Sequence, residues 1–305
     1  MVKIYFDNVD FNSSSGPNTF GSRLATELNL NPEIEIVGKA DNYDIFLCFI
    51  EPTCQPKSSS KFVQRLDGIW FKPDQFESHN QLIKWAYDNA DAVVWQSEFD
   101  KNMTTKWWGN RYGRIISNGI KLEEIKLVPE ILELKEKFDR IFVCSASWHR
   151  QKRLKENIEL FLKVAGQNDA LIVLGKNPDF SSRDRRILYA GQQTHEFCLQ
   201  LYYIADWMIH LAWLDHCPNV VVEALSQGCP VICTDSGGTK ELVQNNGIVI
   251  RESVPYEYQL CDYDNPPSLN FDDFSLSPVA VQKDYLSIKE CAGKYVTLFK
   301  KLIKN

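Results

Sequence analysis

The 305-residue sequence has no excess of positive charge, because 34 Lys and Arg stand against 40 Asp and Glu and the net charge is −6. With a sequence pI near 5.5 it carries no overall basic footprint for nucleic acid, and any phosphate must be bound by a local cluster of cations. Nowhere do about 18 apolar residues follow one another, so no transmembrane helix is predicted. Residues 1–7 lack the charged head, apolar run and cleavage site of a secretory signal.

Cysteine and histidine patterns typical of zinc sites are also missing. The nine cysteines are an odd number and mostly lie inside apolar runs, so we interpret them as reduced core thiols of a cytoplasmic protein. Cys229 and Cys233 have three residues between them, but no second pair at zinc spacing accompanies them. His210, His216 and Cys217 are close in sequence, yet the pattern favours no metal site there.

What the sequence does contain is a regular alternation of short β-branched runs and amphipathic helical stretches. This alternation is typical of parallel sheets covered by helices. Strands are predicted at residues 2–6, 34–37, 43–50, 62–66, 92–95, 114–117, 141–145, 170–174, 187–190, 207–211, 230–234 and 248–250. Helices are predicted at residues 18–29, 79–89, 98–108, 153–164, 195–204, 219–226 and 239–244.

A charged helical stretch at residues 121–138, broken by Pro129, separates two similar series of strands and helices. The fold class predicted is therefore α/β, with two Rossmann-like, doubly wound domains facing a cleft, at residues 1–135 and 136–280. Residues 251–278 combine several prolines with acidic and aromatic residues, so we expect that segment to be irregular.

Residues 281–305 are predicted to form a separate C-terminal helix, centred on residues 281–303. Leu286, Tyr295 and Phe299 lie on its apolar side, and lysines surround it. A basic amphipathic helix of this kind is able to make peripheral contact with a membrane. Because its apolar stripe is only as strong as that of a core-facing helix, we expect it to pack back on the N-terminal domain.

The most informative segment for function runs through residues 215–232. Pro218 is well placed as the first residue of a helix, where its missing N–H costs nothing. The amides that would then be unpaired, and would form an anion site for a diphosphate, are those of Asn219, Val220 and Val221. Glu223 follows about one turn later, where a carboxylate is able to accept hydroxyl donors from a ribose.

Two further segments in the second half support a phosphate site. At residues 233–242 a strand, a glycine turn and a helix follow one another, and Gly237 and Gly238 let the backbone approach a ligand closely. The stretch at residues 145–155 concentrates positive charge at the end of a strand, through Arg150, Lys152, Arg153 and Lys155. A buried diphosphate requires such partners. The alternative is a solvated basic first turn.

In the first half, small residues join the first strand to the first helix at residues 13–20. Ser15 and Gly16 there would let a ligand held by the opposite domain touch the backbone. Arg65 and Asp67 follow a strand end and would line the same cleft. We interpret residues 117–119 as a turn that ends a strand with a left-handed residue, which favours a structural over a functional role for them.

Taken together, these segments resemble glycosyltransferase family 4, the retaining nucleotide-sugar enzymes with the two-domain GT-B fold. The resemblance rests on residues 15–18, 65–68, 96–99, 117–119, 152–154 and 215–242. Its most specific part is Asp215, seven intervening residues and Glu223, followed by Ala-Leu, Gly and Pro-Val-Ile.

The resemblance implies roles for individual residues. Glu223 would hold the ribose hydroxyls, Asp215 would face the transferred sugar, and Lys152 would neutralise the donor diphosphate. Ser147 stands where the family usually has an arginine, so Arg150 or Arg153 would take that part. The donor set would also include Asn219, Val220, Gly16, Gly237 and Gly238, and the acceptor side Ser15, Arg65 and Asp67.

The resemblance also implies the reaction. A hexose-type sugar would pass from a UDP- or GDP-sugar to a glycan or other hydroxyl acceptor by front-face attack, with the donor phosphate taking the proton and the anomeric configuration retained. No metal and no permanently bound cofactor are implied, and the oligomeric state is not indicated. Two alternatives stay open: a nucleotide-sugar epimerase on the same architecture, and a catalytically silent nucleotide-sugar-binding protein, which Asp215 and Ser147 would suit.

Overall fold

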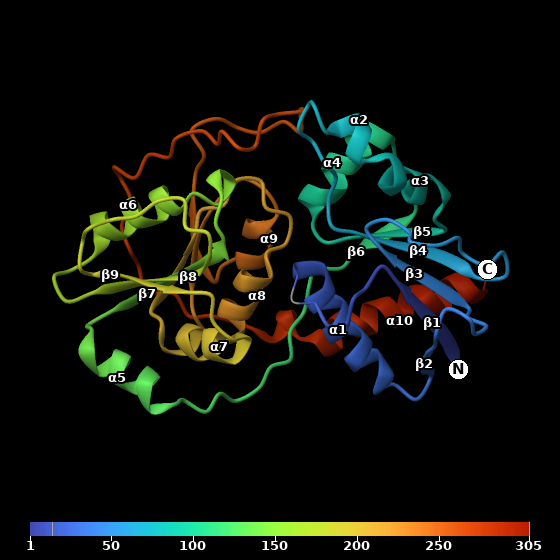
Figure 1. Ribbon diagram of the computed structural model, residues 1–305, viewed down its shortest axis with the longest axis horizontal. Helices are drawn as coiled ribbons and strands as arrows, with labels where there is room; N and C mark the ends of the chain where they lie inside the picture. Colours follow the sequence, from blue (N-terminus) through green and yellow to red (C-terminus); the bar gives the residue numbers. More distant parts are fainter. Residues whose placement is uncertain (14, 305) are drawn as a thin grey trace. The chain divides into compact units, whose positions relative to one another are not determined.

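The computed structural model describes residues 1–13 and 15–304, so Ser14, in the segment that follows the first strand, and Asn305 lie outside the described residues. The chain forms two compact units (Figure 1). The first comprises Met1–Lys121, Tyr258–Cys261 and Leu286–Asn305, and the second comprises Leu122–Glu257 and Asp262–Tyr285.

The first unit contains a sheet of six parallel strands in the order β2-β1-β3-β4-β5-β6. Its strands are β1 (Val2–Asp7), β2 (Ile34–Ile36), β3 (Ile45–Phe49), β4 (Lys61–Leu66), β5 (Ala92–Trp95) and β6 (Gly113–Ile115). Every residue of β3 and β5 is buried, as expected for central strands of a parallel sheet with both faces covered.

The helices of the first unit are α1 (Gly16–Asn29), α2 (Phe76–His79), α3 (Gln81–Asn89), α4 (Glu98–Trp108) and α10 (Ile288–Lys304). The Ser97 hydroxyl caps α4 by accepting the Asp100 amide at 3.1 Å. The helix predicted at residues 79–89 is split at Asn80, whose side chain donates to Trp70 O at 2.6 Å and accepts the Trp70 amide at 3.0 Å. Asn80 thus ties the preceding loop to the start of α3.

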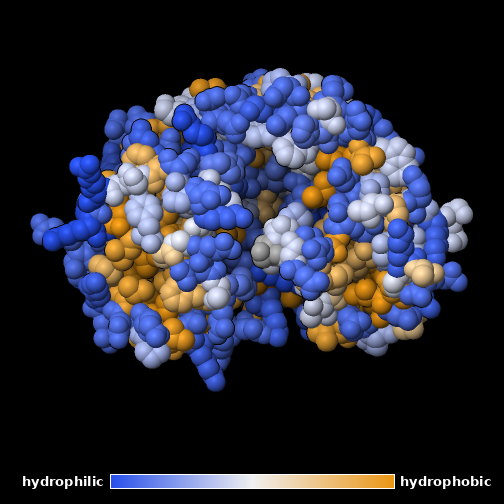
Figure 2. Space-filling view, viewed as in Figure 1, coloured by the Kyte–Doolittle hydropathy of each residue, from blue (hydrophilic) through white to orange (hydrophobic). Residues whose placement is uncertain are grey.

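The C-terminal helix α10 packs against α1, far from it in sequence, and belongs to the core of the first unit (Figure 1). Tyr295 and Phe299 are fully buried there, beside Phe20 and Leu24 of α1. Packing on the N-terminal unit is therefore confirmed, although the helix begins at Ile288 instead of residue 281. Among the described residues, no helix is both long and apolar enough to cross a membrane. Figure 2 shows hydrophilic side chains over most of the visible face of each unit, with apolar patches between them.

The second unit contains another sheet of six parallel strands, in the order β12-β11-β10-β7-β8-β9. Its strands are β7 (Ile141–Ser147), β8 (Ala170–Lys176), β9 (Ile187–Gly191), β10 (Trp207–His210), β11 (Val231–Thr234) and β12 (Gly247–Ile250). The chain builds outward from β7 to β9, then returns to place β10 on the other side of β7. The strand order therefore reverses between β7 and β10.

The helices of the second unit are α5 (Pro129–Lys137), α6 (Leu154–Val164), α7 (His195–Ile204), α8 (Asn219–Ser226) and α9 (Thr239–Val243), with the short 3-10 helices η1 (Arg150–Lys152) and η2 (Asp284–Leu286). The predicted charged helix at residues 121–138 forms only from Pro129 onward, because Val128, the residue before the proline, is driven out of the helical region. The division between units falls at Lys121 instead of residue 135, since the Val128 amide just before α5 donates to Gln200 of α7 at 2.8 Å.

Candidate functional site

The candidate site of the second unit lies at the carboxyl ends of β7 and β10, where the strand order reverses. In open α/β sheets ligands bind at this switch point, because the loops on its two sides diverge and leave room between them. Residues 148–153 follow β7, and residues 211–218 follow β10. These are two of the segments that the sequence singles out.

Lys152, Asp215 and His210 form the charged centre of this edge. The Lys152 ammonium lies 2.5 Å from Asp215 Oδ2, and His210 Nε2 lies 3.2 Å from the same oxygen. Burial alone would raise the pKa of the Asp215 carboxyl, but Lys152 and the His210 hydrogen bond outweigh it and hold that pKa well below its usual range. Burial lowers the pKa of His210 despite the nearby Asp215, which favours the neutral imidazole.

Hydrogen bonds to backbone carbonyls hold together the loops that carry Lys152 and Asp215. The Trp213 amide donates to Gln151 O at 2.9 Å, and Gln151 Nε2 donates back to Trp213 O at 2.9 Å. On the other side of Asp215, its carbonyl accepts the Gly238 amide at 2.7 Å. Gly237 has φ +73°, and a Cβ there would lie 2.5 Å from Asp215 O. The close approach that the paired glycines allow is thus to the Asp215 backbone, and their contact with a donor stays a prediction.

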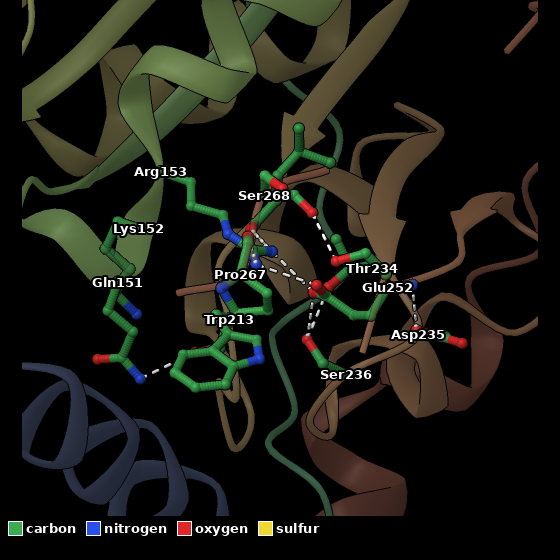
Figure 3. Close-up of polar contacts among 12 residues, drawn as sticks. Gln151, Lys152, Arg153, Trp213, Thr234, Asp235, Ser236, Glu252, Pro267 and Ser268 are labelled. Carbon is green, nitrogen blue, oxygen red and sulfur yellow. Dashed lines mark hydrogen bonds and ion pairs between the residues drawn. The ribbon is translucent and has the colours of Figure 1, made fainter. Parts of the chain in front are cut away.

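Arg153, predicted at the donor phosphates, is instead fully buried, and its side chain points toward Glu252 (Figure 3). Its guanidinium forms a two-pronged ion pair with Glu252, at 2.7 Å and 2.9 Å. Because the side chain is committed to this buried partner, it is not available to a ligand, and the prediction is corrected. Arg150 is exposed at the start of η1, and none of the described residues forms an ion pair with it. Its contact with the donor diphosphate, beside Lys152, stays a prediction.

Helix α8 has its predicted bounds, Asn219–Ser226, but Pro218 caps the helix instead of being its first residue. Pro218 has extended backbone angles and precedes the helix, and its carbonyl accepts the amides of Val221 at 3.1 Å and Val222 at 3.3 Å. The Val221 amide is therefore paired, which corrects its predicted place in an anion site. Contact of a donor diphosphate with Asn219 and Val220, at the start of α8, stays a prediction.

Glu223 lies one turn into α8 and its side chain is only 8% exposed. Its Oε1 is 3.2 Å from His195 Nε2, at the start of α7. Burial, with a further contribution from the Glu223 charge, raises the pKa of the Cys198 thiol to about 11. The first turn of α7 therefore lies against this carboxylate, and the ribose role of Glu223 stays a prediction.

In the first unit, Ser15 and Gly16 are exposed at the start of α1, as expected of a ligand-facing turn. Arg65 is not exposed. Its guanidinium is fully buried, contacts the Asp67 carboxylate, donates to Asn118 Oδ1 at 2.6 Å and stacks over the Phe20 ring at 4.3 Å. The prediction that Arg65 lines the acceptor side is therefore corrected, and Asp67 is the partly exposed member of this pair.

Residues 138–258 match the family model described as glycosyl transferases group 1. This match lies almost entirely within the second unit. The chain is also similar to N-acetyl-alpha-D-glucosaminyl L-malate synthase of Bacillus anthracis, at 24% identity over 184 residues. That match covers 55% of this chain and 48% of the relative, so it spans about half the length of the curated protein.

Solved structures show the same fold over the whole chain. Sucrose-phosphate synthase from Thermosynechococcus elongatus superposes with a TM-score of 0.73 at 14% identity and covers 100% of both chains. The Anabaena protein HepE, solved in complex with UDP-glucose, gives a TM-score of 0.62 at 16% identity and covers 100% of this chain and 99% of its own. The α/β, GT-B fold expected from the sequence is thereby confirmed.

The sequence pattern does not indicate three polar residues that lie at or near the switch point of the second unit: His210, Asn157 and Glu252. Asn157 links both sides of the switch point, because it donates to the Arg153 carbonyl at 2.7 Å and accepts the Leu211 amide at 3.2 Å. Within the part of the chain that the structure describes, no three His, Cys, Asp or Glu residues come together as metal ligands.

Proposed function

We propose that this protein transfers a hexose-type sugar from a nucleotide diphosphate donor to a hydroxyl of a glycan or another acceptor, with retention and without a metal ion. The observation that carries the proposal is the Lys152 ammonium, fixed 2.5 Å from Asp215 at the switch point of a group 1 glycosyl transferase domain. A cation and a carboxylate held together at this edge suit a ligand with a phosphate at one end and a sugar at the other.

A UDP-sugar is the first donor to test and a GDP-sugar the second. HepE, which shares the fold, was solved with UDP-glucose and with UDP. In this chain Glu223 would accept the ribose hydroxyls, and the diphosphate would lie against Lys152, Arg150 and the start of α8. The Gly237 and Gly238 turn and Gly16 complete the proposed donor contacts.

In the reaction, the bond between the anomeric carbon and the diphosphate oxygen breaks, and negative charge collects on the departing diphosphate. Lys152 and Arg150 would stabilise that charge. Asp215 would favour the positive character that develops at the sugar ring. The acceptor oxygen forms the new bond on the face that the diphosphate leaves, and its proton passes to the departing phosphate oxygen. Configuration is then retained.

The acceptor would contact Ser15, Gly16 and Asp67 of the first unit, with Arg65 holding Asp67 in place. A reducing compartment suits the nine cysteines, all of which are free thiols. We therefore propose the cytoplasm as the location.

The proposal is tested by incubating UDP- and GDP-sugars with the protein, with and without acceptor glycans. A new glycoside of unchanged anomeric configuration, formed without added metal and in the presence of EDTA, is the expected product. An altered donor sugar without acceptor would indicate an epimerase, and tight nucleotide binding with neither product would indicate a silent binder. Glu223→Ala should weaken nucleotide binding, whereas Glu196→Ala, an exposed carboxylate of α7, serves as the matched control.

A further inference from the structure

Arg153 adopts a backbone conformation that is uncommon for any residue with a side chain. Its φ of 54° and ψ of 49° lie in the left-handed region, which glycine enters readily and other residues rarely do. The residue ends η1 and precedes α6, so this conformation sets how the chain leaves Lys152. Something in the surroundings must hold an arginine in this position.

The Arg153 side chain is held by a set of buried bonds (Figure 3). Besides the two bonds to Glu252, its Nη2 donates to Pro267 O at 2.7 Å, and both charged side chains are almost fully buried. Glu252 in turn accepts Ser236 Oγ at 2.9 Å, and its amide donates to Asp235 Oδ1 at 2.9 Å. The pair therefore joins the loops that follow β7, β11 and β12, and it ties the irregular segment around Pro267 to them.

The same turn carries Lys152. Asn157 donates to the Lys152 carbonyl at 3.1 Å and to the Arg153 carbonyl at 2.7 Å, so both peptide groups are fixed from the inside of the unit. The Lys152 side chain remains partly exposed, at 21%, while the Arg153 side chain is not exposed at all. The Lys152 side chain is thus partly accessible to solvent, whereas the Arg153 side chain points into the unit.

We propose that Arg153 and Glu252 are positioning residues, which hold the Lys152 turn in a left-handed conformation so that the Lys152 ammonium meets the donor diphosphate. Neither side chain touches the donor. The inference rests on the proposed function for the identity of the ligand, and it rests on the buried ion pair for the mechanism. A purely structural pair would stabilise the fold without any preference for the phosphate end of a ligand.

The test separates these two roles by comparing UDP with uridine, which lacks the diphosphate. In Arg153→Met/Glu252→Gln, no buried charge is left unpaired, and methionine, unlike glycine, does not adopt the left-handed conformation readily. We expect the variant to fold, to bind UDP at least tenfold more weakly than the wild type, and to bind uridine within twofold of the wild type. Calorimetric titration measures both affinities. The control is Arg186→Ala/Asp184→Asn, which removes a partly exposed ion pair of the same unit and should change neither.

A second readout needs no nucleotide. Burial is the main cause that lowers the pKa of His210, and the Lys152 charge lowers it further, so an ammonium that leaves Asp215 should raise the pKa of His210 in an NMR titration. If Arg153→Met/Glu252→Gln fails to fold, Arg153→Lys, which keeps the charge but loses the two-pronged geometry, is measured in the same way. A folded variant with an unchanged ratio of UDP to uridine affinity and an unchanged His210 titration would overturn the inference. If the wild type binds neither UDP nor GDP, the donor proposal fails, while the His210 titration still decides whether the pair positions Lys152.

Discussion

Replacing Lys152 by alanine removes the cation on which the proposed donor site depends. Its ammonium lies 2.5 Å from Asp215, and the two side chains are only 21% and 14% exposed, so solvent screens the pair weakly. A hydrogen bond to a charged group contributes about 1.5–3 kcal/mol, which corresponds to about 10- to 140-fold in affinity at roughly 1.4 kcal/mol per tenfold. We therefore expect Lys152→Ala to weaken UDP binding by at least about tenfold. The Asp215 carboxylate, left without its cation, adds repulsion toward the diphosphate.

Turnover should fall as well, because the diphosphate gains negative charge as the sugar bond breaks. Calorimetry gives the UDP affinity, and glycoside formation at saturating donor gives kcat. Lys155→Ala is the matched control, since Lys155 is 59% exposed and pairs with Glu159 at 3.4 Å on the surface of α6. Such a pair contributes about 0.5 kcal/mol or less. A folded Lys152→Ala protein with UDP affinity and kcat within twofold of the wild type would refute the proposed role.

Two further predictions concern stability of the first unit. Phe299→Ala should destabilise it by about 3–5 kcal/mol because the ring is fully buried. The control, Ile303→Ala on the exposed side of α10, should cost less than about 1 kcal/mol. Equal losses of stability in calorimetric melting would contradict the packing of this helix. Burial raises the pKa of Tyr87 from 10.0 to about 12, so its contribution to stability is complete below pH 10 and is lost as the pH rises through about 12. Melting temperatures measured across this range should fall, and Tyr87→Phe, which cannot ionise, should flatten the decline.

Local patterns predicted most of the fold because short-range physics decides those elements. The strand at residues 92–95 is a run of four apolar residues between polar neighbours, and its bounds are the same in the structure. The bounds of α4 also match, since Ser97 supplies the cap and acidic residues follow in the first turn. Around residues 121–128 composition alone suggested a helix, but the structure starts the helix only at Pro129. There the covalent geometry of proline outweighs helix propensity.

The candidate site was predictable where function depends on position relative to a strand end. Lys152 and Asp215 both follow strands that flank the switch point, and the structure brings them into contact. The fates of Arg153 and Arg65 were not predictable, because each is decided by a distant partner. Glu252 lies 99 residues beyond Arg153, and Asn118 lies 53 residues beyond Arg65. The hydrophobic periodicity of a sequence does not indicate which distant residues pair. An arginine at a strand end is therefore predicted to be exposed unless its partner is known.

The placement of α10 has a consequence for how the protein is made. The ribosome synthesises residues 122–257 before it reaches Ile288, the first residue of α10. Phe299 and Tyr295 of this helix are nevertheless part of the core that contains α1. During synthesis the nascent first unit therefore carries an uncovered apolar surface at Phe20 and Leu24 while the later-made second unit is already able to fold. The first unit, most of which is synthesised first, is thus the last to have all of its residues available.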